Sequence, residues 1–386
     1  VVGEREAEHQ PESMPVAGDE AHARLVQAPR SGARYVLALV TGAVIMILSS
    51  PLVDGSFNFL LPVEAYVALF QGAFGSLDRI AETLAEAAPL ILAGFAVGIG
   101  FKAGLFNIGA QGQFLFGSLF ATAAALALND ASPLVAIPAS LLAGMVGGLL
   151  YGAIPGALKA FTGAHEVVTT IMLNYVAIFL VSGVISGPLR CEDATYSRTC
   201  DFTAARLPFI LGDSGHLGIL LAFAAVPIVW WFLYRSTTGF EVRTTGANSE
   251  AARYAGMSTR WLIIFTMALC GLFAGLAGAT WTQGELGYMP ASGVPTIGFE
   301  AIAVALLGRA NPVGILFAGL LFGAMEAGSG AMELAGIPNE MVTVLQAVIL
   351  FFLTAEVIVR RIFRVREAAA ALGDVGGLAE SYGQRL

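Results

Sequence analysis

The chain has 386 residues, of which 56% are hydrophobic and only 12% are charged, and its mean hydropathy is +0.75. An average soluble domain carries roughly 25% charged residues, so this composition excludes a water-soluble fold. The net charge of -8 gives no support for nucleic-acid binding. Because one crossing takes about 20 apolar residues, the sequence predicts an all-α, polytopic membrane helix bundle with about ten transmembrane helices.

The N-terminal part divides into a polar tail and a first span. Residues 1–33 lack apolar periodicity, and we expect a disordered cytoplasmic tail there. The first span, Tyr35–Ser50, begins in the cytoplasm by the positive-inside rule, because basic residues precede it: Arg24, Arg30 and Arg34. The aromatic segment Phe57–Gly75 is broken by Pro62 and Glu64, and we expect it to lie partly in the external interface.

Four spans follow, and a polar external loop at about residues 188–215 ends this part of the chain. Cys191 and Cys200 flank the centre of that loop, where either a local disulfide or two free thiols would fit. A zinc site would need more ligands at closer spacing, so no metal is expected. The four spans are Leu84–Phe101, Leu105–Leu128, Leu134–Ala157 and Val167–Gly187.

The second half of the chain carries the main cytoplasmic loop, residues 235–260, after the span Leu217–Tyr234. Arginines after the last span place the tail at residues 361–386 inside, so both termini are predicted to be cytoplasmic around a transmembrane domain at residues 34–360. Phe299–Leu307 is short enough to be a broken or half-length helix. The other spans are Trp261–Thr280, Val313–Gly328 and Met341–Val359.

Glycines recur at every fourth position in one predicted span: Gly144, Gly148, Gly152 and Gly156. They form a stripe on one helix face, which lets a second backbone approach closely. We interpret this stripe as helix packing and not as a ligand site.

Three amide side chains, Asn107, Gln111 and Gln113, lie among glycines in the run GLFNIGAQGQ. Amides inside a bilayer need hydrogen-bond partners, so they either join neighbouring helices or line a wet pathway. Both interpretations remain open, and all three residues are candidates for the solute pathway.

Glu166 and Asn174 are further pathway candidates, because they share one face of a predicted helix with Thr170. Glu166 could equally be a carboxylate that the helix N-terminus favours. Trp281 lies with Gln283 and Glu285 at the outer end of a span, where a tryptophan can be an interface anchor or part of a solute entrance.

The chain contains no GxxxxGK[ST] loop, and Lys102 and Lys159 are its only lysines. It therefore cannot bind a nucleotide phosphate by that route. A nucleophile elbow and an HExxH motif are also absent. We therefore expect no catalytic residue and no cofactor, and we do not expect this chain to be an enzyme.

Four segments resemble, in order, motifs of permease subunits of bacterial ABC importers: GLFNIGAQGQFLFG, HEVVTTIMLNYVA, GANSEAARYAGMS and GFEAIAVALLGRANPVG. The resemblance spans about Leu84–Phe352 and is greatest to the nucleoside permeases of the branch that handles simple sugars, nucleosides and branched-chain amino acids. Gln111 stands where this family often has Glu, and His165 where it often has Asn, so no charge-dependent role carries over to position 111.

This resemblance implies a bacterial inner-membrane protein that moves nucleosides, in particular purine nucleosides, by alternating access. It implies three protein partners: a separate ABC ATPase, a second homologous permease and an extracytoplasmic substrate-binding lipoprotein. The segment GANSEAARYAGMS would be the cytoplasmic coupling helix that docks on the ATPase. Its coupling residues would be Asn248, Glu250, Ala252, Arg253 and Gly256.

Two other functions remain possible on the residues alone. A simple-sugar permease of the same superfamily, specific for a ribose-like solute, would differ only in its substrate. An ion-coupled secondary transporter would need acids buried in the membrane to carry the coupling ion. The predicted spans place few acids at mid-depth.

Overall fold

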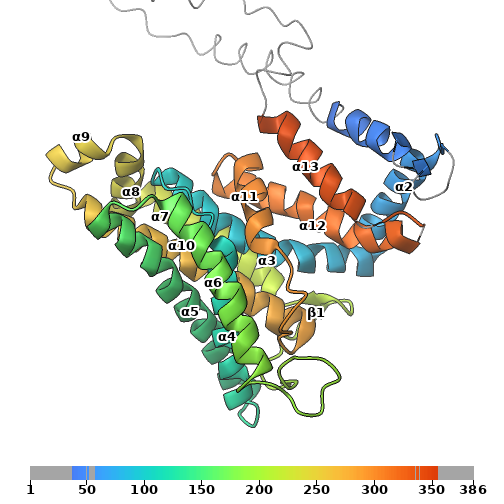
Figure 1. Cartoon of the computed structure of the whole chain (residues 1–386), viewed down its shortest axis with the longest axis horizontal. Coiled ribbons are helices and arrows are strands. Elements are labelled where there is room, and N and C mark those ends of the chain that lie inside the picture. Colours follow the sequence, from blue (N-terminus) through green and yellow to red (C-terminus); the bar gives the residue numbers. More distant parts are fainter. Residues whose placement is uncertain (1–36, 49, 52–56, 335, 339, 355–386) are drawn as a thin grey trace, which may run out of the picture.

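The structure is a computed structural model of the whole chain, and it describes residues 37–48, 50–51, 57–334, 336–338 and 340–354. Helices dominate the described residues, as Figure 1 shows. Six of them are long and apolar enough to cross a membrane: α3 (Leu77–Lys102), α5 (Pro133–Thr162), α6 (Glu166–Ser186), α7 (Gly218–Arg235), α10 with its extension (Thr259–Leu286) and α12 (Pro312–Leu334).

Shorter helices complete the bundle. Three are apolar and have 10–17 residues: Leu37–Leu48, α11 (Ile297–Leu307), and Met341–Phe351 within α13 (Glu340–Thr354). The others are α2 (Leu61–Phe74), α4 (Ala110–Ala127), α8 (Thr237–Ala247) and α9 (Ser249–Tyr254). The predicted membrane helix bundle is confirmed, but the count of about ten spans corresponds here to six long helices plus shorter ones. The two tails, with the predictions made for residues 1–33 and 361–386, lie outside the described residues.

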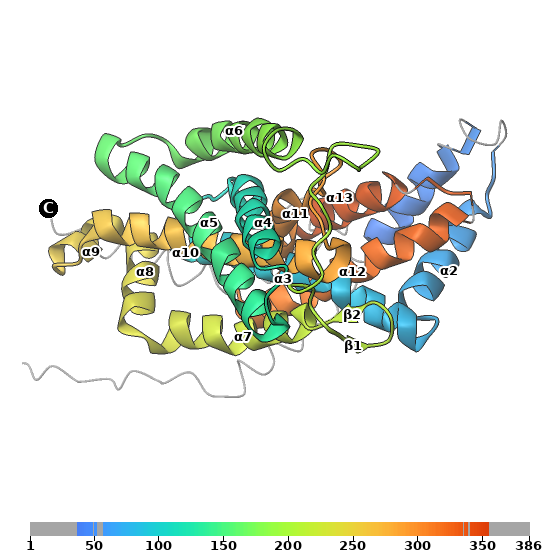
Figure 2. The same ribbon diagram turned by 90° about the horizontal axis from the view of Figure 1, so that it is seen from below.

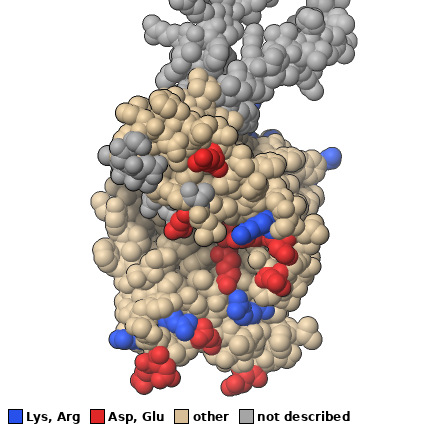
Figure 3. Space-filling view, turned by 90° about the vertical axis from the view of Figure 1, so that its right-hand side faces the viewer, with Lys and Arg blue, Asp and Glu red and all other residues tan. Residues whose placement is uncertain are grey.

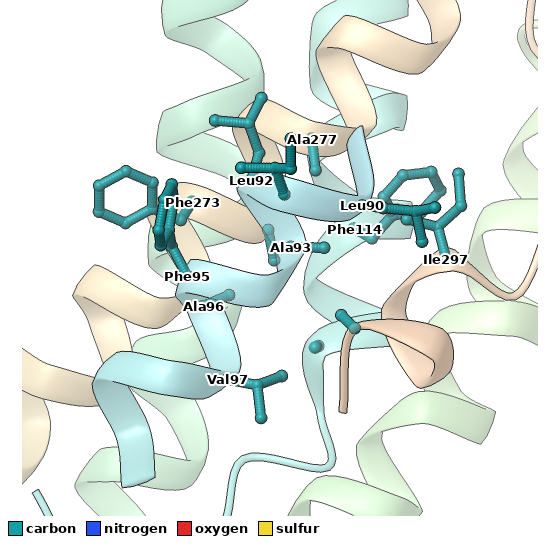
Figure 4. Close-up of a cluster of buried hydrophobic side chains, with 14 of the residues drawn as sticks. Leu90, Leu92, Ala93, Phe95, Ala96, Val97, Phe114, Phe273, Ala277 and Ile297 are labelled. Atoms are coloured by element: carbon teal, nitrogen blue, oxygen red, sulfur yellow. The ribbon is translucent and has the colours of Figure 1, made fainter. Parts of the chain in front are cut away.

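Helix α3 lies at the centre of the bundle. In its apolar window 83% of the residues are buried, against 28% in α6. Its side chains reach neighbours on several sides: Phe95 meets Phe273 of α10 edge to face, while Leu90 lies on the side of Phe114 and Ile297 (Figure 4). These contacts explain why α3 carries apolar residues all round and shows no single apolar face.

The tightest helix pair is α5 against α10, and the glycine stripe lies on it. A Cβ atom built at Gly148 would overlap the carbonyl oxygen of Gly271 and lie 2.6 Å from the Cα atom of Gly275. A Cβ at Gly152 would lie 2.9 Å from the Cα atom of Gly271. The predicted role of this stripe in close helix packing is therefore confirmed.

The turn between α3 and α4 differs from the predicted span Leu105–Leu128, because α4 begins only at Ala110. Gly104 has φ +70° and packs on the backbone of Gly246 in α8. Only a glycine fits such a left-handed, crowded position easily, so the chain turns there before the helix starts.

Two breaks in helical geometry occur late in the chain. A π-helical turn, Thr282–Leu286, follows α10 directly. Helix α11 has only 11 residues, which confirms the predicted short helix. It is followed by Arg309 and Ala310, both with positive φ, and α12 then begins at Pro312.

The loop between α6 and α7 contains two short strands, β1 (Phe209–Leu211) and β2 (Gly215–His216), and the predicted all-α class is confirmed for the bundle itself. The described structure has a Cys191–Cys200 disulfide, which decides between the two alternatives left open by the sequence. This loop runs antiparallel beside residues 283–291: Thr199 donates a backbone hydrogen bond to Met289, and Leu207 donates one to Gln283.

Candidate functional site

Two of the predicted pathway residues, Asn107 and Gln113, form hydrogen bonds with each other. Asn107 Nδ2 donates to Gln113 Oε1 at 2.9 Å, and Gln113 Nε2 donates back to Asn107 Oδ1 at 3.1 Å. Both side chains are buried. The pair joins the turn before α4 to the first turn of α4.

Gln111 and Asn174 also have partners on other elements. Gln111 Nε2 donates to the carbonyl of Pro295 at 2.9 Å, and its Oε1 accepts the backbone N–H of Gly298 at 2.8 Å. Asn174 Oδ1 accepts from Gly112 N at 2.8 Å, and its Nδ2 donates to the Ile108 carbonyl at 2.9 Å. Gln111 therefore fixes the segment that leads into α11.

Glu166 is the first residue of α6 and forms an ion pair with Lys159 of α5. Glu166 is 7% exposed, whereas the side chain of Lys159 is partly exposed. Of the six predicted pathway residues, Glu166 therefore joins α5 to α6 and four amides join neighbouring segments. The sixth, Trp281, lines a cavity.

That cavity has a volume of about 230 Å³ and lies between α3, the π-helical turn, α11 and α12. Acidic side chains cluster about the hollowed centre of the face seen in Figure 3. Four glutamates line the cavity, together with one aromatic and three apolar residues: Glu86, Glu285, Glu300 and Glu326, with Trp281, Leu90, Pro295 and Ile297. We refer to it as the acid-lined cavity.

The carboxylates of the acid-lined cavity have few partners of their own. Glu300 accepts a hydrogen bond from Thr296 at 2.8 Å, whereas Glu285 Oε1 is buried and has no hydrogen-bond partner. No ion pair between any of the four and a lysine or arginine is found among the described residues. Nor, within those residues, do His, Cys, Asp and Glu form a group that could hold a metal ion.

Trp281 and Glu285 are four positions apart, directly before and within the π-helical turn, and therefore lie on the same helix face. A π turn widens the helix and inserts a residue, and such turns are frequent at functional sites. Residues four apart, Trp281 and Glu285, both line the cavity. The loop between α6 and α7 holds the turn in place, since Arg206 Nη2 donates to the Glu285 carbonyl at 3.1 Å and Leu207 N donates to that of Gln283.

His216 packs on the outer side of the same turn. Its ring lies against Gly284 and Gly218, its Nδ1 accepts the Gly218 N–H at 3.1 Å, and its Nε2 is buried without a partner. Burial, helped by the positive charge of Arg206, lowers the pKa of His216 to about 4. The imidazole is therefore neutral at physiological pH.

The predicted coupling residues lie together at the far end of the bundle, on α9 and its flanks, as Figure 2 shows. Asn248 caps α9, its Oδ1 accepting the Ala251 N–H at 3.0 Å. Ala252 is buried under the helix, while Glu250 and Arg253 are exposed. Gly256 ends the segment with φ +84°.

Glu285 was noted beside Trp281 at the end of a predicted span, whereas no pattern in the sequence singled out Glu86 or Glu300. Glu86 and Glu300 lie 214 positions apart in the sequence, so no spacing rule connects them. The available signal was the presence of an acid inside each of several apolar segments, which marks a functional candidate by default.

Comparison with known proteins identifies the family. The family described as branched-chain amino acid transport system / permease component matches residues 79–354. The guanosine ABC transporter permease protein NupP of Bacillus subtilis is 38% identical over 84% of this chain and 92% of its own length. The nucleoside permease NupB of Lactococcus lactis is 37% identical over 80% and 91%, and the glucose permease TsgB13 of Haloferax volcanii 39% over 76% and 81%. The chain therefore belongs to this family of multi-pass membrane proteins and is the permease subunit of an ABC importer, which works with a separate ATPase and a binding protein.

Proposed function

We propose that this permease carries nucleosides, in particular purine nucleosides, across the bacterial inner membrane. The observation that carries the proposal is the extent of its similarity to two permeases named for guanosine and for nucleosides, which covers at least 80% of this chain in each case. Membership of the ABC importer family assigns the energy source to ATP, so a coupling ion is not needed.

A simple sugar is the second candidate substrate. The glucose permease is as similar to this chain, at 39% identity over 310 residues, as the two nucleoside permeases are. Identity alone does not separate the two solutes, because a permease fold is shared by carriers of different substrates. Uptake measurements have to decide between them.

The geometry around α9 supports a coupling role for the five predicted residues. Tyr254 is 92% exposed, and Arg253 and Glu250 are exposed beside it, whereas Ala252 anchors the helix. This surface would dock on the ATPase. Displacement of α9 would reach the bundle through α8, because Gly246 packs on the backbone of the α3–α4 turn at Lys102 and Ala103.

The complete importer would contain a second homologous permease and an extracytoplasmic lipoprotein that delivers the solute. The pathway would open alternately to the two sides of the bilayer as the ATPase domains close and separate. No bond in the solute changes during this cycle.

Uptake of labelled guanosine, adenosine, ribose and glucose by cells with and without the chain tests the proposal. We expect loss of guanosine and adenosine uptake, but not of ribose or glucose uptake, on deletion. Arg253→Glu should reproduce that loss while leaving the amount of permease in the membrane unchanged. Arg190→Glu, the same charge reversal at an exposed position of the external loop, is the matched control. Loss of glucose or ribose uptake alone would refute the nucleoside assignment.

A further inference from the structure

The four carboxylates of the acid-lined cavity need an explanation, because acids on apolar membrane helices are costly: Glu86, Glu285 and Glu300 are half-buried, and Glu326 is exposed at the opening of the cavity. Glu86, Glu285 and Glu326 come from α3, the π-helical turn and α12, and Glu300 comes from α11. No lysine or arginine compensates them in the described part of the chain. A structural role would satisfy these groups within the protein, as it does for Asn107 and Gln113.

Two independent features point to an organic ligand. Trp281 is only 5% exposed and lines the cavity, and its indole N–H has no acceptor among the described residues. Glu285 Oε1 is buried and also without a partner. The cavity therefore contains an unused donor, an unused acceptor and an aromatic ring.

A single metal ion does not fit this arrangement. In the part of the chain that the structure describes, no three acidic, histidine or cysteine side chains are close enough to hold one. The carboxylates are distributed around a space of about 230 Å³, which suits a molecule that offers several separate hydrogen-bond donors.

We propose that the acid-lined cavity is the subsite that receives the donor-rich ring of the transported solute, and that this ring is the base of a purine nucleoside. A carboxylate oxygen accepts hydrogen bonds and a protonated carboxyl group also donates one, so a cluster of carboxyl groups can pair with a ring that presents N–H donors beside a carbonyl oxygen. Guanine presents two adjacent donors, its ring N1–H and its 2-amino group, to a carboxylate that can accept both. Trp281 supplies the wall against which a flat base packs.

The size of the cavity agrees with this assignment. Pockets for drug-sized ligands measure about 300–1,000 Å³. A space of about 230 Å³ is smaller, and it accommodates a ring system better than a whole nucleoside. The ribose would then extend towards the opening of the cavity.

This inference rests on the proposed function, since it names the part of the substrate that the cavity reads. Sugar hydroxyl groups are donors too, and a sugar ring can also pack on tryptophan. The test therefore has to compare solutes that differ in one donor. Inosine differs from guanosine only in lacking the 2-amino group.

The experiment measures the KM of guanosine uptake by the intact importer, and the inhibition of that uptake by inosine and by glucose. The variants are single replacements of each cavity glutamate by glutamine. We expect the wild-type importer to prefer guanosine to inosine. At least one variant, Glu285→Gln in the first place, should reduce this preference about tenfold, because its new amide N–H faces the donor groups of guanine.

Two further variants separate recognition from folding. Glu333→Gln makes the same change on α12 outside the cavity and should leave both KM and the preference unchanged. Trp281→Leu removes the aromatic wall and should raise the KM of guanosine and of inosine by similar factors. The quantity of importer in the membrane is measured for every variant, so that KM is compared only among folded proteins.

The outcomes are distinguishable. If wild-type cells take up guanosine but all four glutamine variants keep the wild-type preference, the subsite assignment is wrong while the nucleoside function stands. If the wild type takes up no nucleoside, the proposed function itself fails. If glucose competes with guanosine and its inhibition weakens in the glutamine variants, the ring in the cavity is a sugar and the assignment to a base is refuted.

Discussion

The α5–α10 interface and the acid-lined cavity lie in the same bundle but differ in their packing: the interface is closed by direct contact between two helices, and the cavity is not filled by side chains. Between α5 and α10, the glycines Gly148 and Gly271 bring two backbones into direct contact. Around the cavity, four glutamates and Trp281 surround a space that the protein does not fill. The protein itself therefore completes the interface, whereas Glu285 Oε1 at the cavity has no hydrogen-bond partner among the described residues.

We therefore expect the interface residues to contribute mainly to stability and the cavity residues to contribute mainly to function. Helix packing in a membrane depends on close van der Waals contact, which small residues permit. Unpaired polar groups lower stability and are retained where a substrate uses them. Substitutions in the two regions should therefore have opposite effects on stability.

The largest effect is expected from Gly148→Leu. Even a Cβ atom at this position would overlap Gly271, and backbone atoms cannot move aside as a flexible side chain can. We expect the free energy of unfolding to fall by about 4 kcal/mol. Unfolding of the purified chain in mixed micelles at increasing SDS concentration measures this change.

Gly183→Ala is the matched control for that substitution. Gly183 also lies in a membrane helix, α6, but a Cβ atom built on it meets nothing within 4 Å. The alanine variant should be as stable as the wild type or more stable, by up to about 1 kcal/mol, because alanine has the higher helix propensity. A comparable loss of stability in both variants would contradict the role of close packing between α5 and α10.

The packing of the bundle was predictable because it depends on local patterns. The fourfold spacing of Gly144 to Gly156 identifies a helix face, and the short apolar run before Arg309 predicts the short helix α11. The start of α4 was placed about five residues too early, because apolar residues such as Leu105 continue the hydropathy of the span through the turn at Gly104. Hydropathy does not record the backbone conformation that ends a helix.

The candidate cavity was predictable only in part, because it is formed by residues from four elements. Trp281 was selected because it lies at the end of a predicted span, and Glu285 because it lies close to Trp281 in the sequence. Fourfold spacing puts Glu285 on the same helix face as Trp281, but this spacing does not show which other helices close a cavity on that face. Glu86 joins it only through the packing of α3 against α10 and α12.

A second prediction concerns His216. Its buried ring packs against Gly284 and Gly218, but its Nε2 has no hydrogen-bond partner among the described residues. Its folded-state pKa is about 4, below the ordinary value of 6.5, so the unfolded chain binds the proton more readily. Stability from this residue is therefore complete above pH 6.5 and is lost as the pH falls towards 4. The loss amounts to about 3 kcal/mol.

Thermal unfolding of the purified wild type and of His216→Asn between pH 7.5 and 4 measures this effect. Asparagine can accept the Gly218 N–H but does not titrate. We expect the wild type to lose more stability on acidification than the variant does. Parallel pH curves for the two proteins would show that His216 is not buried in its neutral form.

The smallest change in stability is expected for Glu285→Gln, and this variant tests the difference between the α5–α10 interface and the acid-lined cavity most directly. Glu285→Gln replaces a carboxylate whose Oε1 is buried and unpaired with a neutral amide of the same shape. An acid at this site costs free energy whether its charge is desolvated or a proton neutralises it, and an amide avoids both costs. The variant should therefore be more stable than the wild type, by about 1 kcal/mol, while guanosine uptake becomes weaker. Glu333→Gln, an exposed change on α12, should alter neither quantity. Unfolding in SDS and uptake kinetics on the same preparations test both halves of this expectation. If the variant lost stability together with uptake, Glu285 would have a structural role in the protein without substrate. The proposed difference between the α5–α10 interface and the acid-lined cavity would then be wrong.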